Sequence, residues 1–407
     1  MRRTRVDLRV IIFIAVIIGS LLTAMPASAG GIVVVENDVE YSFAQQVTFT
    51  LAVTSDVEIS QIHLFFRATG DDDTEKVAVA LEKPEREVSV RQTRDLGVYP
   101  LPPFADITFW WQIEDAAGNR LQTEPEEFKY ADNRFQWTEM RVGGISVHWI
   151  EGRGDPAYAQ TALDIAQASV KDINAELRAP FPDPLDIYIY DTEHNLEAAM
   201  VLTGRDWVGG QARPELGVVV VAVPPEQGYS SRMRRYLPHE ITHLLVYQLM
   251  TAEGYRGVPI WLDEGLATVN ERLPTPEYAL ALKEAYESNQ LISLKDLCAP
   301  FSPDASIAFL SYAQSVSVVR FIREQYGADG IRRLLAAYAD GASCTSGVEE
   351  ALDISFNQLE GAWQASLRSE TRWRVWMDQV GVWIGLWLLS ALVAVPMIGR
   401  VRRERSK

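Results

Sequence analysis

The stretch YLPHEITHLL, Tyr236 to Leu245, carries two of the chain's five histidines, His239 and His243, with Glu240 directly after the first. Residues four apart lie on one face of an α-helix, so both imidazoles can bind one ion. Glu240 is offset by about 100° around the helix axis. Its carboxylate therefore stays near that face without ligating beside both histidines, and it can reach a water bound to the ion. This spacing is typical of metal-assisted hydrolysis.

An exposed amphipathic helix that carries these residues by chance is the simpler alternative. The apolar residues Ile241, Leu244, Leu245 and Val246 lie on several sides of the helix and favour burial, and buried histidines need polar partners. Pro238 allows two interpretations: the helix begins there, where proline is tolerated, or it is kinked there.

A zinc site with two histidines and a water lacks one protein ligand. The segment GVPIWLDEGLATVNERL places Glu264 twenty-one residues after His243. A helix, a turn and the first turn of a second helix fill that distance, so Glu264 can face the histidines. Alternatively, Asp263 and Glu264 only complement the positive end of the second helix. Both roles are compatible, because a first-turn carboxylate is also well placed to ligate.

HEITH followed by WLDEGLA resembles the gluzincin zinc peptidases of the peptidase MA-like group, over residues 136–370. The resemblance implies Zn²⁺ as the cofactor, with His239, His243 and Glu264 as ligands, Glu240 as general base and Asp263 as a neighbour of the third ligand. The glycine-alanine-methionine-glutamate-asparagine motif of the aminopeptidase branch has no counterpart here, so the resemblance does not imply aminopeptidase activity.

Two further features follow from the same resemblance. Related enzymes use a tyrosine after the third ligand to stabilise the developing oxyanion, which makes Tyr312 the candidate donor. Packing or substrate lining is the alternative for one of 15 tyrosines. The segment VGGQARPELGVVVV is similar to the edge strand that pairs with extended substrate in related enzymes.

Residues 31–132 show the period of β-strands. QVTFTLAVT, ISQIHLFFR, KVAVALE, EVSVRQT and ITFWWQIED are separated by turn-rich segments. Short strands at this spacing predict an all-β sandwich, immunoglobulin-like or fibronectin-like. His63 is out of phase with the apolar positions of its strand and is interpreted as a surface residue.

The pattern changes from residue 136 onward. DPAYAQTALDIAQASVKDINAEL has apolar residues at helical spacing after an aspartate cap, whereas LDIYIYD and GVVVVAVP are predicted strands. Mostly helical segments follow, so residues 136–370 are predicted to form an α+β, zincin-like peptidase domain.

Both ends of the chain indicate a membrane protein. Residues 1–29 have a basic start, an apolar run and small residues at Ala27 and Ala29, as in a secretory signal peptide, or alternatively an uncleaved anchor. Residues 378–399 predict one C-terminal transmembrane helix, with a buried core helix as the alternative, and 400–407 a basic cytoplasmic tail. The region between would lie outside the cell.

Charge and cysteine content agree with that topology. Without residues 1–29 and 400–407, the chain carries 29 basic and 53 acidic groups, a net charge of −24. Such a surface repels nucleic acid. Cys298 and Cys344 are predicted either to form a disulfide, which an oxidising compartment permits, or to remain buried thiols.

These features predict a membrane-tethered extracytoplasmic zinc metallopeptidase that acts on a peptide or protein substrate. The competing hypothesis is a catalytically silent cell-surface binding or scaffold protein that uses the β-sandwich and a peptidase-like domain. The sequence does not determine the cleavage specificity or the oligomeric state.

Overall fold

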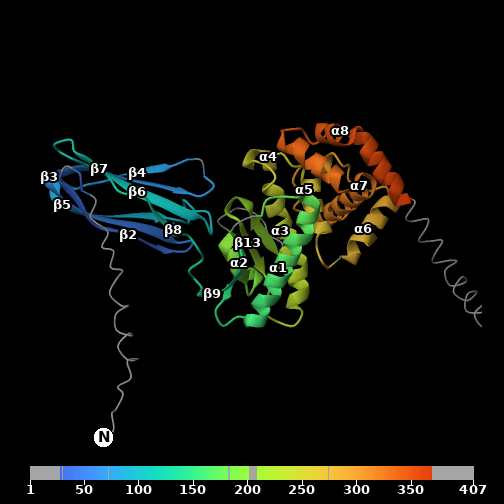
Figure 1. Ribbon diagram of the computed structural model, residues 1–407, viewed down its shortest axis with the longest axis horizontal. Coiled ribbons are helices and arrows are strands. Elements are labelled where there is room, and N and C mark those ends of the chain that lie inside the picture. Colours follow the sequence, from blue (N-terminus) through green and yellow to red (C-terminus); the bar gives the residue numbers. More distant parts are fainter. Residues whose placement is uncertain are drawn as a thin grey trace, which may run out of the picture. The chain divides into compact units, whose positions relative to one another are not determined.

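The computed structural model describes residues 28–29, 31–71, 73–181, 184–200, 209–273 and 275–368. The chain divides into two compact units, Met1–Ala131 and Asp132–Lys407 (Figure 1). The predicted transmembrane helix and basic tail lie outside the described residues. So does the predicted signal segment, except for Ser28–Ala29, which pairs as a short strand with Ile32 and Val33.

The first unit is rich in β-structure. Its strands are β1 (Ser28–Ala29), β2 (Ile32–Ser42), β3 (Gln46–Ala68), β4 (Glu75–Val79), β5 (Glu85–Asp95), β6 (Asp106–Asp115), β7 (Arg120–Gln122) and β8 (Glu126–Lys129). The hydrogen-bonded order is β1-β2-β3-β6-β7, while β4 and β5 also pair with β3, and β8 pairs with β6.

Strand β3 is the organising element of this unit. Its first half, Gln46 to Thr54, lies between β2 and β5, and its second half pairs with β4 and β6. Phe49 in the first half stacks on Phe66 in the second, with ring centroids 5.6 Å apart. Seventeen residues of straight strand would separate them by about 56 Å. The strand therefore folds back on itself, and its halves lie in two facing layers.

The sequence prediction of two separate strands, QVTFTLAVT and ISQIHLFFR, is wrong at this point. Both belong to β3, and the pairing register shifts between Thr54 and Ile59. The residues between the two apolar runs read as a turn, but their backbone keeps strand conformation, so the chain continues as one bent strand. An immunoglobulin-like or fibronectin-like topology stays a prediction.

The second unit contains a five-stranded sheet. Its strands are β9 (Trp137–Val142), β10 (Ile145–Ile150), β11 (Leu185–Tyr190), β12 (Gly210–Arg213) and β13 (Val218–Ala222), in the order β12-β13-β11-β10-β9. The three central strands are parallel, and β9 and β12 run antiparallel at the edges. The glycine-containing edge strand expected from VGGQARPELGVVVV is thus present as β12.

Helices complete this unit. They are α1 (Pro156–Leu177), α2 (Glu193–Met200), α3 (Tyr229–Tyr247), α4 (Ala252–Arg256), α5 (Ile260–Val269), α6 (Pro276–Glu287), α7 (Ala305–Ala339) and α8 (Ser346–Leu352), with short 3₁₀ turns η2 (Pro214–Leu216) and η3 (Asp296–Cys298) and a last described helix over 356–368. The predicted cap of α1 is confirmed, because Asp155 accepts a hydrogen bond from the Tyr158 N–H.

Helix α3 packs between α1 and α5, and α5 packs against α7. Among the described helices, α7 alone is long and apolar enough to cross a membrane. It packs inside this unit against α5, α6 and α8, and its regular geometry is interrupted at Gly327, where φ is +65°. A helix that packs in a core passes the same test of length and composition, so α7 is weak evidence for a membrane span.

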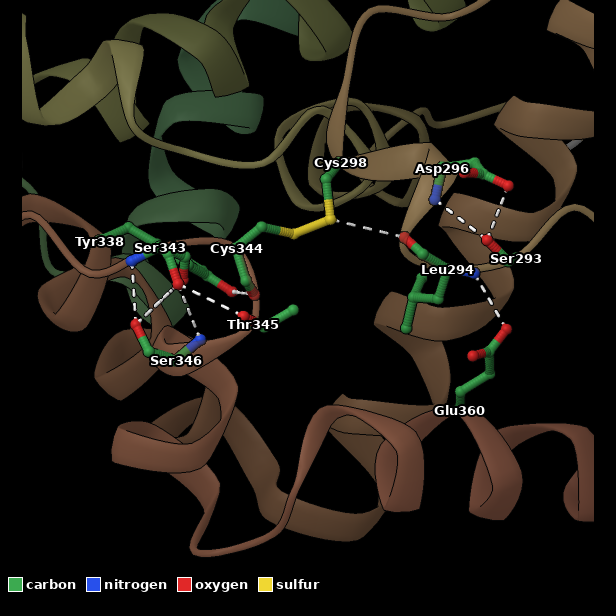
Figure 2. Close-up of a disulfide and its surroundings, with 10 residues drawn as sticks. All are labelled: Ser293, Leu294, Asp296, Cys298, Tyr338, Ser343, Cys344, Thr345, Ser346 and Glu360. Atoms are coloured by element: carbon green, nitrogen blue, oxygen red, sulfur yellow. Dashed lines mark hydrogen bonds between the residues drawn. A yellow bond between two sulfur atoms is a disulfide. The ribbon is translucent and has the colours of Figure 1, made fainter.

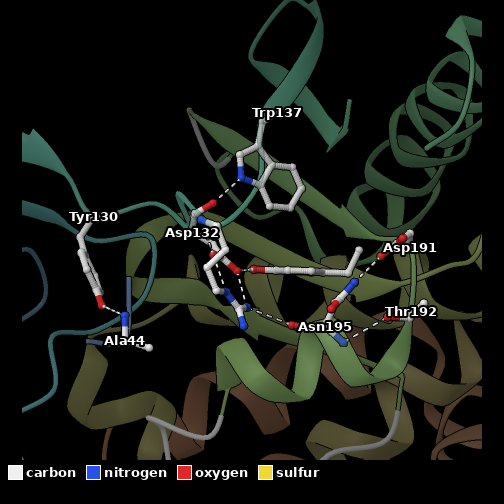
Figure 3. Close-up of polar contacts among 9 residues, drawn as sticks. Ala44, Tyr130, Asp132, Trp137, Asp191, Thr192 and Asn195 are labelled. Atoms are coloured by element: carbon white, nitrogen blue, oxygen red, sulfur yellow. Dashed lines mark hydrogen bonds and ion pairs between the residues drawn. The ribbon is translucent and has the colours of Figure 1, made fainter. Parts of the chain in front are cut away.

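A buried polar group secures the start of the second unit (Figure 3). The carboxylate of Asp132 accepts hydrogen bonds from Arg134 Nε at 2.8 Å and from the Tyr190 hydroxyl at 2.9 Å. The Trp137 indole donates to the Asp132 carbonyl, and Arg134 also donates to the carbonyl of Asn195 in α2. The entering chain is therefore tied to β9, β11 and α2.

Cys298 and Cys344 form a disulfide, with Cα atoms 6.1 Å apart (Figure 2), which confirms the first of the two predictions for these residues. The bond joins the segment between α6 and α7 to the loop that precedes α8. Around it, the Tyr338 hydroxyl donates to the Cys344 carbonyl at 2.9 Å, and Glu360 accepts from the Leu294 N–H at 2.9 Å.

Replacing both cysteines by serine should lower the free energy of unfolding by about 2–4 kcal/mol, because a crosslink across 46 residues restricts the unfolded chain. Urea denaturation followed by tryptophan fluorescence measures the change. A reducing agent should lower the free energy of unfolding of the wild type by the same amount and leave that of the double variant unchanged. Equal midpoints for the oxidised wild type and the double variant would contradict this role.

Candidate metal centre

Helix α3 carries both histidines and Glu240. Its apolar side chains are completely buried, namely those of Leu237, Ile241, Leu244 and Leu245. Pro238 lies inside α3, so the interpretation that the helix begins there is wrong. A proline inside a helix leaves the carbonyl four residues earlier without its helical donor. Here that carbonyl belongs to Arg234 and accepts a hydrogen bond from the Arg272 N–H at 2.9 Å, outside the helix.

Three ligand atoms converge in front of α3. Glu264 Oε2 lies 3.3 Å from His239 Nε2 and 4.0 Å from His243 Nε2, and the three side chains offer ligand atoms within 4.8 Å of one another. Ligand atoms about 2.0–2.1 Å from a tetrahedral zinc ion would be about 3.3 Å apart. Glu264 Oε2 is also buried without a hydrogen-bond partner, as suits an atom that ligates a cation. The residues present therefore fit a zinc ion.

The other ring nitrogens face carboxylates. His239 Nδ1 lies 3.2 Å from Glu271 Oε1, and His243 Nδ1 lies 3.1 Å from Asp263 Oδ1. The Tyr255 hydroxyl donates to Asp263 Oδ2 at 3.0 Å. The hydrogen bond to Glu271 favours the His239 tautomer that leaves Nε2 to ligate, and Asp263 lies within ion-pair distance of His243 Nδ1. This outer pair accounts for Asp263, which the sequence placed only beside the third ligand.

Sequence reasoning missed Glu271. It lies seven residues after Glu264, which is two helical turns, and that spacing would have placed both on the same face of an extended second helix. The signal was weak, because α5 ends at Val269 and the chain has left the helix at Glu271.

The carboxylates around the two histidines favour positive charge at the site. Burial disfavours the charged form of His243, but the carboxylates of Asp263 and Glu264 outweigh burial and raise its pKa to about 9. The pKa of His239 is likewise raised, because Glu264 and Glu271 outweigh its burial. For Glu264, the two histidines outweigh burial and lower the pKa. A field that stabilises imidazolium in this way also stabilises a bound cation.

Glu240 lies beside these groups and against β12. Burial raises the pKa of its carboxyl, although both histidines and the backbone N–H of Ala212 oppose that shift. A Cβ atom on Gly210 would come within 2.8 Å of Glu240 Oε1. Glycine at that position therefore lets the edge strand pass this close without displacing the carboxylate.

Close packing of α5 on α7 brings Tyr312 to the site. A Cβ on Gly265 would lie 2.7 Å from the Ser315 carbonyl oxygen, so the two helices approach as closely as glycine permits. Tyr312 lies one turn before Ser315 and its hydroxyl lowers the pKa of Glu264. Burial and Glu264 in turn raise the pKa of Tyr312, whose ring packs edge-on against Phe301 at 5.1 Å.

Comparison with known proteins gives the class. The sequence profile of the Peptidase MA superfamily matches residues 165–369, and the chain belongs to this superfamily. Membership points to a peptidase, and members of this superfamily are typically metallopeptidases. The match covers α3, α5 and α7, the helices that carry the residues described above. No curated protein sequence matches the chain.

Solved structures resemble the chain only distantly. An aminopeptidase N family protein from Idiomarina loihiensis has a TM-score of 0.39 at 8% identity, over 79% of this chain and 74% of its own. Wild-type OgpA from Akkermansia muciniphila has a TM-score of 0.21 at 11% identity, over 25% of this chain and 28% of its own. The chain thus spans between a quarter and a third of the length of OgpA. Scores at this level assign neither activity nor substrate.

Changing Gly265 to Ala should destabilise the second unit by about 1–3 kcal/mol, because the added methyl group meets the α7 backbone and forces α5 away. Thermal unfolding measures the effect. Gly361 is the matched control: it is also helical, but a Cβ there meets nothing within 4 Å. Gly361→Ala should stabilise slightly, since alanine favours a helix. Equal melting temperatures for the two variants would refute the close-packing account.

Proposed function

We propose that the protein is a zinc metallopeptidase of the gluzincin type, which hydrolyses peptide bonds outside the cytoplasm while tethered to a membrane. One observation carries the proposal. His239, His243 and Glu264 converge on a single position beside Glu240, in a chain that belongs to the Peptidase MA superfamily.

In this proposal, the two histidines and Glu264 hold zinc, which when bound supplies a Lewis acid that polarises a carbonyl and lowers the pKa of water toward ~7. Glu240 acts as the general base. It accepts a proton from the attacking water and then delivers that proton to the leaving amine. Its raised pKa, caused mainly by burial, supports this double task, since a carboxylate with a higher pKa is a stronger base toward the proton of the water.

Two elements around Glu240 and Glu264 support the handling of a peptide. Strand β12 runs antiparallel at the sheet edge, with the Ala212 N–H directed at Glu240, so an extended substrate bound along it would present its backbone to the base. Tyr312 lies on α7, with its hydroxyl beside Glu264. We assign it the role of donor to the developing oxyanion.

The cellular location rests on the sequence and on the disulfide. Residues 378–399 with the basic tail 400–407 supply the proposed anchor, and residues 1–29 supply the export signal. The Cys298–Cys344 bond supports an oxidising compartment for the second unit. The excess of acidic residues favours a peptide or protein partner over nucleic acid.

Replacing Glu240 by Gln should reduce peptide hydrolysis by about 10²–10⁴-fold and leave zinc bound, because the amide cannot accept the proton. Mass-spectrometric profiling of a peptide library with the purified protein measures turnover and also defines specificity. Glu284→Gln, at an exposed position of α6, is the control and should keep full activity. Unchanged turnover in the Glu240 variant would refute the mechanism, and zinc without turnover in the wild type would favour the binding-protein hypothesis.

Replacing Glu264 by Ala should lower zinc affinity by more than the roughly 10–100-fold that changes outside the ligand set cause, because a direct ligand is lost. Metal analysis of the purified variant after dialysis against a chelator gives the stoichiometry. Glu284→Ala should bind zinc as the wild type does. An unaltered zinc content in the Glu264 variant would remove this residue from the ligand set.

A further inference from the structure

The segment Asn270–Arg272, which we call the clip, follows α5 and runs along α3. Each of its three residues contacts a different point of that helix. The contacts are Asn270 Nδ2 to Thr242 Oγ1 at 3.2 Å, Glu271 Oε1 to His239 Nδ1 at 3.2 Å, and the Arg272 N–H to the Arg234 carbonyl at 2.9 Å. The clip therefore follows α3 for about two turns, on the side of His239 that faces away from Glu264.

The last of these contacts uses a carbonyl that Pro238 leaves without a helical donor. In a regular helix, the Arg234 carbonyl would accept from the N–H of residue 238, and proline has none. The ring of a proline also pushes the carbonyl four residues earlier away from the helix axis. The freed carbonyl is then available to the Arg272 N–H, which follows Glu271 directly.

The clip is also held from outside α3. The Arg272 side chain pairs with Asp172 in α1. Asn270 Oδ1 accepts from Arg323 in α7 at 3.0 Å, and Arg323 forms an ion pair with Glu176 in α1. These contacts restrict the clip at both ends, so the backbone on either side of Glu271 has little freedom.

We propose that Pro238 and the clip form one positioning device for His239. Pro238 opens the Arg234 carbonyl, the Arg272 N–H occupies it, and the neighbouring Glu271 is thereby set against His239 Nδ1. Pro238 and Glu271 are positioning residues that act through His239. This inference rests on the proposed role of His239 as a metal ligand.

Pro238→Ala tests the device. Alanine restores an N–H that closes the helical bond to Arg234 and turns this carbonyl back toward the helix axis, where it is a poorer acceptor for the Arg272 N–H. Glu271 is then held only through the side chains of Asn270 and Arg272, and we expect zinc affinity to fall by about 10-fold, the lower end of the effect of disturbing a group that orients a ligand. Folding should not suffer, because alanine is favoured over proline inside a helix. Pro276→Ala is the matched control: this proline stands at the first turn of α6, where it displaces no hydrogen bond, and zinc affinity should stay unchanged.

A double-mutant cycle with Glu271→Ala identifies the route. Chelator competition gives the zinc dissociation constant of each variant, and the absorption spectrum of the cobalt-substituted protein reports the geometry at the ion. If Pro238 acts through Glu271, adding Pro238→Ala to Glu271→Ala should cause no further loss of affinity. Glu271→Gln keeps an acceptor oxygen and should lose less affinity than Glu271→Ala.

Two outcomes would overturn the inference: wild-type zinc affinity in the Pro238 variant, or losses that add fully in the double variant. Hydrogen exchange at the Arg272 amide gives a reading that does not depend on metal, since it should accelerate in Pro238→Ala, and unchanged protection would also refute the device. Zinc affinity is measured without peptide turnover. A protein that binds zinc but cleaves no peptide would therefore refute the proposed activity. The double-mutant cycle of zinc affinities would still test the positioning device.

Discussion

The whole site depends on burying charged and polar side chains in the apolar interfaces between packed helices. Helix α3 is enclosed by α1, α5 and β12, yet it carries two imidazoles and a carboxylate. Leaving a buried polar group without a hydrogen-bond partner costs more free energy than one hydrogen bond contributes. Each of these side chains therefore needs a partner on a neighbouring element. Glu271 hydrogen-bonds His239, and the carboxylates of Asp263 and Glu264 lie within ion-pair distance of the histidines. The backbone of β12 supplies a partner for Glu240.

Two glycines and one proline set the distances in this arrangement. The glycines act through their missing side chain, and the proline acts through its missing backbone N–H. Gly210 lets β12 approach Glu240, and Gly265 lets α5 approach α7. Pro238 frees a carbonyl of α3 for the clip. Each lies next to, or in contact with, a residue of the proposed chemistry. The approach of backbone to backbone therefore decides the geometry, and the functional side chains follow from it.

Much of this unit was predictable because it rests on local rules. Helical periodicity places His239 and His243 on one face whatever surrounds the helix. Asp155 caps α1 through a contact three residues away. Two cysteines in a chain allow only one intramolecular pairing, so the disulfide needed no knowledge of the fold beyond the compartment. Glu264 was within reach because its distance along the chain suits two successive helices.

The remaining features depend on residues that are distant in sequence. The bend of β3 appears only when its halves face each other across the first unit. The position of Pro238 inside α3, instead of at its start, is settled by a donor 34 residues later, the Arg272 N–H. The contact of Glu271 with His239 and the approach of Tyr312 to Glu264 likewise form only when α5 is packed against its neighbouring helices. By itself, the sequence determined which side chains share a helical face and that their types suit a metal ion. Only the tertiary structure decided which carboxylates complete the site, because burial creates a demand for partners that local spacing does not record.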